Sequence, residues 1–183
     1  MLTAMRRLRR QCERKLSDLP LPEPFSLEAL VTNMEAATGR TIKMVPLDDR
    51  RSDLRTACGL RVRTGDLSLI FYRPRPTQNQ TDHVKLHELV HEWFDHGTTL
   101  GEAEFRLLVP EYLRQSLSDR MGSGLVVQGR ARYDTREEQE AELSASLIKR
   151  IVRRQQLPAG GDLVSLLEST LSHPVAAPRR IQK

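Results

Sequence analysis

The chain has 183 residues and a formal net charge of +5, with 38% hydrophobic and 29% charged residues. This composition is typical of a globular protein, and the length suffices for one domain that buries a core. All apolar runs are shorter than the roughly 20 residues that a membrane helix needs, and the basic N-terminus lacks the apolar segment of a secretory signal. We therefore expect a cytoplasmic protein without membrane spans, in which the two cysteines, Cys12 and Cys58, stay reduced.

Residues 2–17 place apolar side chains near the helical period and are rich in arginine, which predicts a basic helix. A basic surface of this kind suits nucleic acid or an acidic protein partner. Aromatic residues make up only 4% of the chain, so nucleic-acid bases would find few stacking partners. We therefore favour a solvated helix face over direct nucleic-acid binding.

Short elements follow the proline-rich segment that ends this helix. Ser26 predicts the N-cap of a second helix, and Gly39 predicts its C-terminal end. The segments 40–47, 56–63 and 66–73 are rich in β-branched or alternating apolar residues, and the letters TGD between the last two are typical of a hairpin turn. The sequence thus predicts a small, mainly antiparallel sheet in an α+β fold.

A third helix is predicted over residues 83–95, with Thr81 or Asp82 as its N-cap and Gly97 just beyond its end. Apolar side chains on one side of this helix favour its burial. They are Leu86, Leu89, Val90 and Trp93.

The C-terminal half combines an irregular segment with two more predicted helices. Residues 97–132 lack a clear period, apart from a helical turn or two near 103–118, and an insert of this kind is usually mobile or functional. A helix over 134–156 begins with acids and ends with bases, which suits the helix dipole. A last helix over 161–172 precedes a basic tail. The apolar stripe of the 134–156 helix consists of Leu143, Leu147, Ile148 and Ile151.

Residues 87–91 read HELVH, so His87 and His91 lie about one helical turn apart on one face. Two neutral imidazoles at this spacing can bind one zinc ion, and the carboxylate of Glu88 lies beside them. Zinc lowers the pKa of its water toward roughly 7, and Glu88 can accept that proton as the water attacks a peptide carbonyl. We prefer this interpretation to a histidine-rich polar helix face.

A catalytic zinc site requires a third protein ligand. The extended HExxHxxGxxH pattern fails, because Phe94 stands at the glycine position and Gly97 at the histidine position. Asp95 is expected to be a polar C-terminal residue or a partner of a ligand. A continuing helix would point His96 away from the metal.

An acid from the later helix is the other source of a third ligand. Four glutamates crowd its start: Glu137, Glu138, Glu140 and Glu142. These acids also suit a solvated first turn that complements the helix dipole. Glu138 and Glu142 lie one turn apart, whereas Glu140 continues the row of Leu143 and Leu147 and points inward.

The motif HELVH, followed by EEQEAELSASLIK, resembles the ImmA/IrrE family of zinc metallopeptidases, whose members carry an HExxH helix and a downstream glutamate-bearing helix. The resemblance implies a minimal thermolysin-like zincin in which His87, His91 and Glu138 hold the zinc and Glu88 is the base. In thermolysin-like sites an acid four residues after the ligand holds a histidine ring. Glu142 would take that role, and Glu140 is the alternative ligand.

The resemblance further implies a small bacterial protein, often linked to mobile elements, that acts with or cleaves a helix-turn-helix repressor. We therefore expect a zinc-dependent endopeptidase of regulatory type. The alternative is a non-catalytic binding module that retains the metallopeptidase fold, although docking alone does not need Glu88. A DNA-associated factor that uses its basic ends is a third hypothesis.

The expected organisation has three parts. Residues 1–20 form the basic N-terminal helix, residues 21–158 the metallopeptidase domain, and residues 159–183 a C-terminal helix with a basic tail.

Overall fold

The computed structural model describes residues 2–47, 59–64, 66–96, 98–99, 111, 114–115, 126–129 and 136–156. The chain divides into two units, Met1–Ile148 and Lys149–Lys183, and the site described below lies in the first. Several predictions lie outside the described residues. They are the state of Cys58, most of the helical turns near 103–118, the helix over 161–172 and the basic tail.

The two N-terminal helices agree with the sequence-based prediction. α1 spans Leu2–Leu16 and α2 spans Leu27–Thr38. The Ser26 hydroxyl caps α2 by accepting a hydrogen bond of 3.0 Å from the Ala29 amide. Gly39 ends α2 in the left-handed conformation, with φ 68°, where a side chain would be strained.

The described strands form one sheet in the order β1–β3–β2–β5–β4. They are β1 (Thr41–Pro46), β2 (Gly59–Thr64), β3 (Leu67–Tyr72), β4 (Thr98–Thr99) and β5 (Val126–Gly129). β1 pairs with β3 in parallel, and the other junctions are antiparallel. The predicted α+β class and mainly antiparallel sheet are therefore confirmed for the described residues.

β4 and β5 correct the prediction that residues 97–132 are an irregular insert. β5 pairs with β2 in a register that sets Val62 opposite Val127. Two β-branched residues in succession, Val126 and Val127, carried a strand signal too short to distinguish from an irregular segment. Cross-strand pairing with β2 stabilises β5, although the local sequence alone has only a weak preference for a strand.

α3, which spans Gln78–Trp93, begins earlier than the sequence predicts. Thr77 is its N-cap, so the prediction of Thr81 or Asp82 is wrong. Thr81 is buried instead, and its hydroxyl accepts a 2.8 Å hydrogen bond from the Arg75 amide and donates one of 3.2 Å to the Arg75 carbonyl. The side chain that looked like a cap thus ties the preceding loop to the helix.

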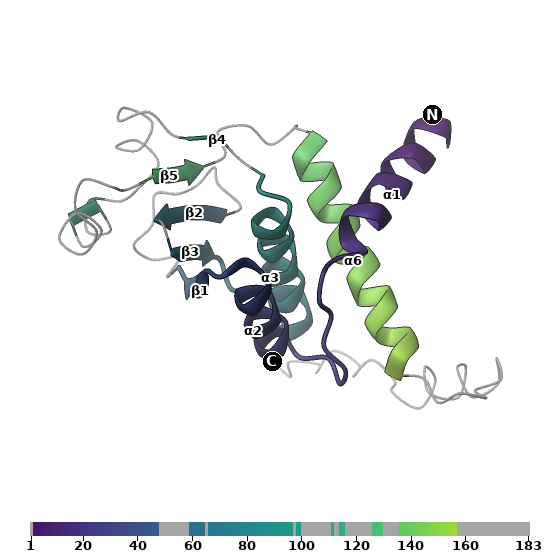
Figure 1. Ribbon diagram of the computed structural model, residues 1–183, viewed down its shortest axis with the longest axis horizontal. Coiled ribbons are helices and arrows are strands. Elements are labelled where there is room, and N and C mark those ends of the chain that lie inside the picture. The colour runs from purple at the N-terminus through teal and green to yellow at the C-terminus, as the bar shows by residue number, and fades with distance from the viewer. Residues whose placement is uncertain are drawn as a thin grey trace, which may run out of the picture. The chain divides into compact units, whose positions relative to one another are not determined.

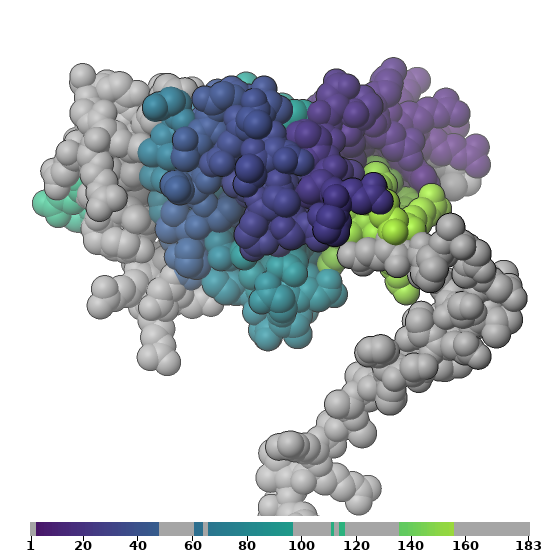
Figure 2. Space-filling model, turned by 60° about the horizontal axis from the view of Figure 1, so that its bottom comes forward, coloured from purple at the N-terminus to yellow at the C-terminus, as the bar shows by residue number. Residues whose placement is uncertain are grey.

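The last described helix, α6, spans Arg136–Gln156. α3 contacts both α2 and β3, and in Figure 1 it lies between the sheet and the pair formed by α1 and α6. Figure 2 also shows α1 beside α6. Of the predicted apolar stripe, Leu147 and Ile148 are buried, whereas Ile151 is 38% exposed. The core consists mainly of Leu30, Met34, Val62, Ile70, Phe71, Leu89, Val90 and Ile148.

α1 is more than a solvated basic helix, because one side of it is buried. Cys12 and Leu16 are both buried, and the Cys12 thiol lies 3.7 Å from the backbone carbonyl of Glu140. Burial raises the pKa of the Cys12 thiol, so this residue is a neutral core side chain at neutral pH. Among the described residues, no helix has the length and apolar character that crossing a bilayer would require.

Candidate metal centre

His87 and His91 lie on successive turns of α3 and point their Nε2 atoms at the same place. The two Nε2 atoms are 3.1 Å apart, and the ring centroids are 4.7 Å apart. His91 is 2% exposed and His87 9% exposed, because Leu86, Leu89 and Val90 bury the same helix. The predicted apolar side of α3 therefore fixes the histidine pair inside the protein rather than on its surface.

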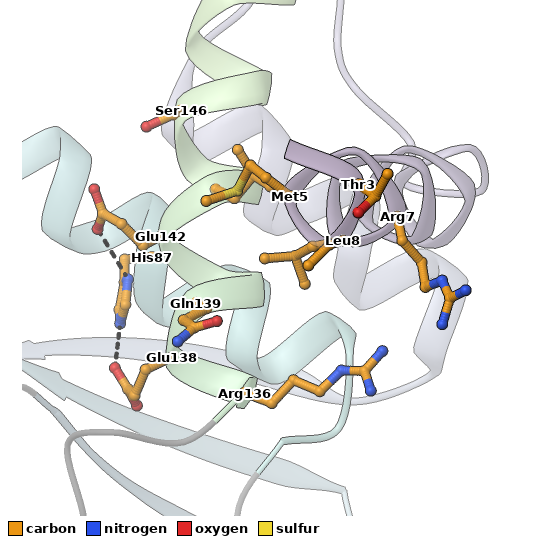
Figure 3. A pocket seen from close by; sticks show the side chains of 12 residues that line it. Thr3, Met5, Arg7, Leu8, His87, Arg136, Glu138, Gln139, Glu142 and Ser146 are labelled. Carbon is orange, nitrogen blue, oxygen red and sulfur yellow. Dashed lines mark ion pairs between the residues drawn. The ribbon is translucent and has the colours of Figure 1, made fainter. Parts of the chain in front are cut away.

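Glu138 of α6 completes the group from the other side. Its carboxylate oxygens lie 3.3 Å from Nε2 of His87 and 3.6 Å from Nε2 of His91. In the described part of the chain, these three residues are the group whose donor atoms lie within 4.8 Å of one another and can hold a metal ion. Figure 3 shows the Glu138 carboxylate directed at the His87 ring.

The donor separations test whether a zinc ion fits. Bonds from zinc to nitrogen or oxygen of about 2.0–2.2 Å in a tetrahedron separate the donors by about 3.3–3.6 Å. The two Nε2 atoms are 3.1 Å apart, one Glu138 oxygen is 3.3 Å from Nε2 of His87 and the other is 3.6 Å from Nε2 of His91, so the donors lie near that spacing. Two neutral imidazoles and one carboxylate are also a donor set that zinc accepts. The residues that the sequence predicts as ligands therefore fit the ion.

Glu88 follows His87 on α3 and is only 2% exposed. A buried carboxylate next in sequence to a histidine of the donor group is a candidate for proton transfer. Its position one residue from a ligand follows directly from the helix, so the sequence-based prediction of its location needs no tertiary information.

Glu142 lies one turn beyond Glu138 on α6 and contacts two histidines of α3. Its oxygens are 3.0 and 3.1 Å from Nε2 of His83, and one is 3.6 Å from Nδ1 of His87. The predicted role of holding a ligand ring thus has a geometric basis at His87. His83 was not predicted to take part, although it lies four residues before His87, on the same row of the helix.

His96 lies beside His91, on the Nδ1 side of its ring and outside the donor group, and a turn places it there in place of the continuing helix that we expected. α3 ends at Trp93, and Asp95 adopts a positive φ of 55° that turns the chain back. The His96 amide then donates a 2.9 Å hydrogen bond to the His91 carbonyl, and the Nδ1 atoms of the two rings are 3.1 Å apart. The expectation assumed a continuing helix, and the left-handed residue is what invalidates it.

Glu140 points inward, as its position in the apolar row predicts, and is 3% exposed. It is not part of the donor group. Its carboxylate accepts hydrogen bonds from Lys15 at 2.5 Å, Gln11 at 3.0 Å and Arg136 at 3.1 Å. Burial alone would raise the pKa of Glu140, but Lys15 foremost, with His96 and Arg136, lowers it below the ordinary value. Glu140 is therefore an ionised residue outside the donor group that joins α6 to α1.

A buried ionic cluster fastens the C-terminal end of α3 to the sheet. The Glu92 carboxylate accepts hydrogen bonds from Arg40 (3.0 Å), Arg61 (3.1 Å), Arg63 (3.2 Å) and Ser68 (2.9 Å). Burial would raise the pKa of Glu92, but Arg61 and Arg63 outweigh it and the pKa is lowered. No sequence motif pointed to these residues. The usable signal was the alternation of Arg61 and Arg63 on one face of β2.

Arg61 also binds the backbone of the metal-site segment. Its guanidinium donates a 2.9 Å hydrogen bond to the His91 carbonyl and a second one to the His96 carbonyl. Arg63 pairs with the Asp95 carboxylate. Asp95 is thus a polar residue at the helix end, as expected, and it stabilises the turn that places His96.

A cavity of about 1160 Å³ opens beside the donor group. His87, Glu138 and Glu142 line its polar side, and Met5 and Leu8 of α1 contribute apolar wall. Figure 3 shows Met5 and Leu8 reaching from α1 toward α6. Met5 is 61% exposed, which is unusual for a large apolar side chain. A molecule that enters the cavity and reaches the donor group would therefore contact an apolar surface.

Comparisons with known proteins return no match: no family model, no curated protein and no solved structure resembles the chain closely enough to be reported.

Proposed function

We propose that this chain is a zinc-dependent endopeptidase of regulatory type, similar to the ImmA/IrrE metallopeptidases, that cleaves or inactivates a helix-turn-helix repressor. The observation that carries the proposal is the convergence of His87, His91 and Glu138 from two helices into one donor group. Glu88, the conventional proton-transfer residue of this pattern, directly follows His87 in the sequence and is buried.

A zinc ion held by these residues would supply Lewis-acid activation of a water molecule. The chain's own groups do the rest. The Glu88 carboxylate accepts a proton from the water that attacks the peptide carbonyl and returns it to the leaving nitrogen. The contact between Glu142 and Nδ1 of His87 holds that ring so that Nε2 faces the donor group. The apolar wall at Met5 and Leu8 binds substrate and excludes water.

The nature of the substrate rests on the resemblance in the two motifs. The cavity supports a protein substrate, because it is large enough for several side chains and is continuous with the donor group. A repressor segment that inserts an apolar side chain between α1 and α6 would bring its backbone to His87 and Glu138.

The decisive experiment compares the wild-type chain with Glu88→Gln. Zinc binding is measured by competition with a chromophoric chelator, and cleavage by mass spectrometry of a mixed peptide library. We expect both proteins to bind one zinc ion and only the wild type to generate new peptide ends, because the substitution removes proton transfer alone. Cleavage by Glu88→Gln at the wild-type rate would contradict the proposed base.

Two other outcomes would redirect the proposal. A wild-type chain that binds no zinc is not a metallopeptidase of this kind. Zinc binding by both proteins with cleavage by neither, even of a repressor encoded beside this chain, would favour the non-catalytic binding module.

A further inference from the structure

His96 lies between a metal-donor residue and a buried carboxylate. Its Nδ1 atom is within hydrogen-bond distance of Nδ1 of His91, at 3.1 Å, and its Nε2 atom is 3.4 Å from Oε2 of Glu140, which is an ion-pair contact and not a hydrogen bond. All three side chains are in the protein interior, with residue exposures of 2% for His91, 5% for His96 and 3% for Glu140. A row of three buried polar groups in contact implies a defined hydrogen-bond direction, because burial makes an unmatched donor or acceptor costly.

The direction of the hydrogen bond between His91 and His96 follows from the proposed use of Nε2 of His91 as a metal donor. A neutral imidazole carries one N–H, and a nitrogen that binds a metal carries none. Because Nε2 of His91 faces the donor group, its proton is on Nδ1, and that N–H points at His96. Nδ1 of His96 must then accept, which leaves the His96 proton on Nε2, facing the Glu140 carboxylate.

Glu140 is in turn held by the N-terminal helix. Lys15 donates to Oε2 at 2.5 Å, and Gln11 donates to Oε1 at 3.0 Å. The Trp93 indole, at the end of α3, donates to the Lys15 carbonyl at 3.3 Å, which fastens the same turn of α1 to the metal-bearing helix. α1 therefore contacts Glu140, at one end of the row, and Trp93, two residues after His91, although it lies outside the two motifs that define the site.

We propose that His96 and Glu140 are positioning residues for His91, and that Lys15 makes α1 a working part of the metal centre. The row fixes the tautomer and the ring orientation of His91, and a histidine ligand fixed in this way binds zinc more tightly. The inference rests on the proposed role of His91 as a zinc ligand. It assigns Glu140, the alternative ligand on sequence grounds, a place behind the ligands rather than among them.

The first test measures zinc affinity by chelator competition in the full chain at constant pH. His96→Phe keeps a ring of similar size but removes the acceptor, and we expect zinc affinity to fall by about 10–100-fold. His96→Asn places an amide oxygen near the position of Nδ1 and should restore most of the affinity. Thermal unfolding of the metal-free proteins checks that both variants fold. An affinity of His96→Phe equal to the wild-type value would overturn the inference.

The second test is a double-mutant cycle on α1, which stays informative if His96→Phe folds poorly. Lys15→Met should weaken zinc binding, whereas Arg14→Met, which removes the same charge from an exposed neighbouring position, should not. If Lys15 acts through the row, Lys15→Met should add little once His96 is replaced by Phe. Equal effects of Lys15→Met and Arg14→Met would exclude a specific role for α1.

The third test reads the tautomers directly. Nitrogen-15 chemical shifts of the zinc-loaded protein should show His96 with a bare Nδ1 and a protonated Nε2, a pattern that mere structural packing would not impose. The opposite tautomer would overturn the proposed direction. Failure of the wild type to bind zinc would remove the proposed function itself, whereas normal zinc binding with unchanged variants would remove only this inference.

Discussion

Nε2 of His83 lies 3.0 Å from Oε1 of Glu142. This contact joins the first half of α3 to the turn of α6 that follows Glu138, so the carboxylate that reaches His87 is itself held in place. The two helices that supply the donor group are thus joined at that group and again one turn away from it.

Replacement of Glu142 tests this second connection. We expect Glu142→Ala to weaken zinc binding by about 10–100-fold, because His87 loses the group at its Nδ1 side. His83→Ala should cause a smaller loss, since Glu142 still reaches His87. Glu13→Ala, in an exposed pair with Arg9 on α1, is the control and should leave the affinity unchanged. Wild-type affinity in Glu142→Ala would show that the 3.6 Å contact with His87 does not matter.

Zinc titrations also separate the two candidate third ligands. Glu138→Ala should lose most of its zinc affinity, because the carboxylate that faces both Nε2 atoms is gone. Glu140→Ala should keep the donor set and lose affinity only to the extent expected of a residue behind it, about 10–100-fold. A Glu140→Ala protein that loses its metal while Glu138→Ala retains it would reverse the assignment.

Loss of the Glu92 carboxylate should lower the free energy of unfolding more than loss of an exposed ion pair. Glu92→Ala removes the buried carboxylate that pairs with Arg61, which is 7% exposed. Loss of one partner from a buried ionic cluster costs about 3–5 kcal/mol of unfolding free energy. Urea denaturation of the metal-free protein measures this cost. Glu13→Ala, at the surface, should change the same free energy by less than about 1 kcal/mol, and a similar small change in Glu92→Ala would contradict the structural role.

The pKa of Glu92 predicts how this stabilisation depends on pH. The pKa is lowered in the folded protein from its ordinary value of 4.5, so the folded state binds its proton less readily than the unfolded state. The stabilisation is therefore complete above pH 4.5 and is lost as the pH falls through the folded-state pKa. The difference in unfolding free energy between wild type and Glu92→Gln should shrink on acidification. A difference that grows would contradict the expected direction of this pH dependence.

The cavity wall predicts a substitution that separates substrate binding from metal binding. Met5→Glu should raise KM for peptide cleavage and leave zinc affinity unchanged, because Met5 lines the cavity but contacts no donor atom. Arg10→Gln makes the same change in net charge on α1 outside the cavity lining and is the matched control. Equal kinetic effects of the two variants would mean that only the charge of α1 matters.

Local patterns were sufficient to predict most of the described elements and the two histidines of the donor group. The i, i+4 spacing of His87 and His91 and the capping signals around α2 act within one helix, so neighbouring residues determine them. Glu138 was harder, because its pairing with the histidines depends on how α6 crosses α3. The two-motif resemblance, rather than spacing alone, favoured it over Glu140.

The partners behind the site were beyond the reach of sequence patterns. His96 was misplaced because a single left-handed residue, Asp95, reverses the chain, and aspartate adopts that conformation only occasionally. Glu92 and Arg61 come from elements far apart in sequence, and a charged residue in a polar helix reads as solvated unless its tertiary neighbour is known. The missed residues are those whose environment is built by tertiary contacts.

The contact between Gln11 and Glu140 spans 129 residues, which has a consequence for synthesis of the protein. Translation releases the N-terminal segment first, and α1 must wait for α6 before its buried side finds a partner. Glu138 emerges in the same late stretch, so a nascent chain that already carries both histidines still lacks the third donor. The centre can mature only after nearly the whole of the first unit has left the ribosome, and a truncated chain would lack the means to assemble it.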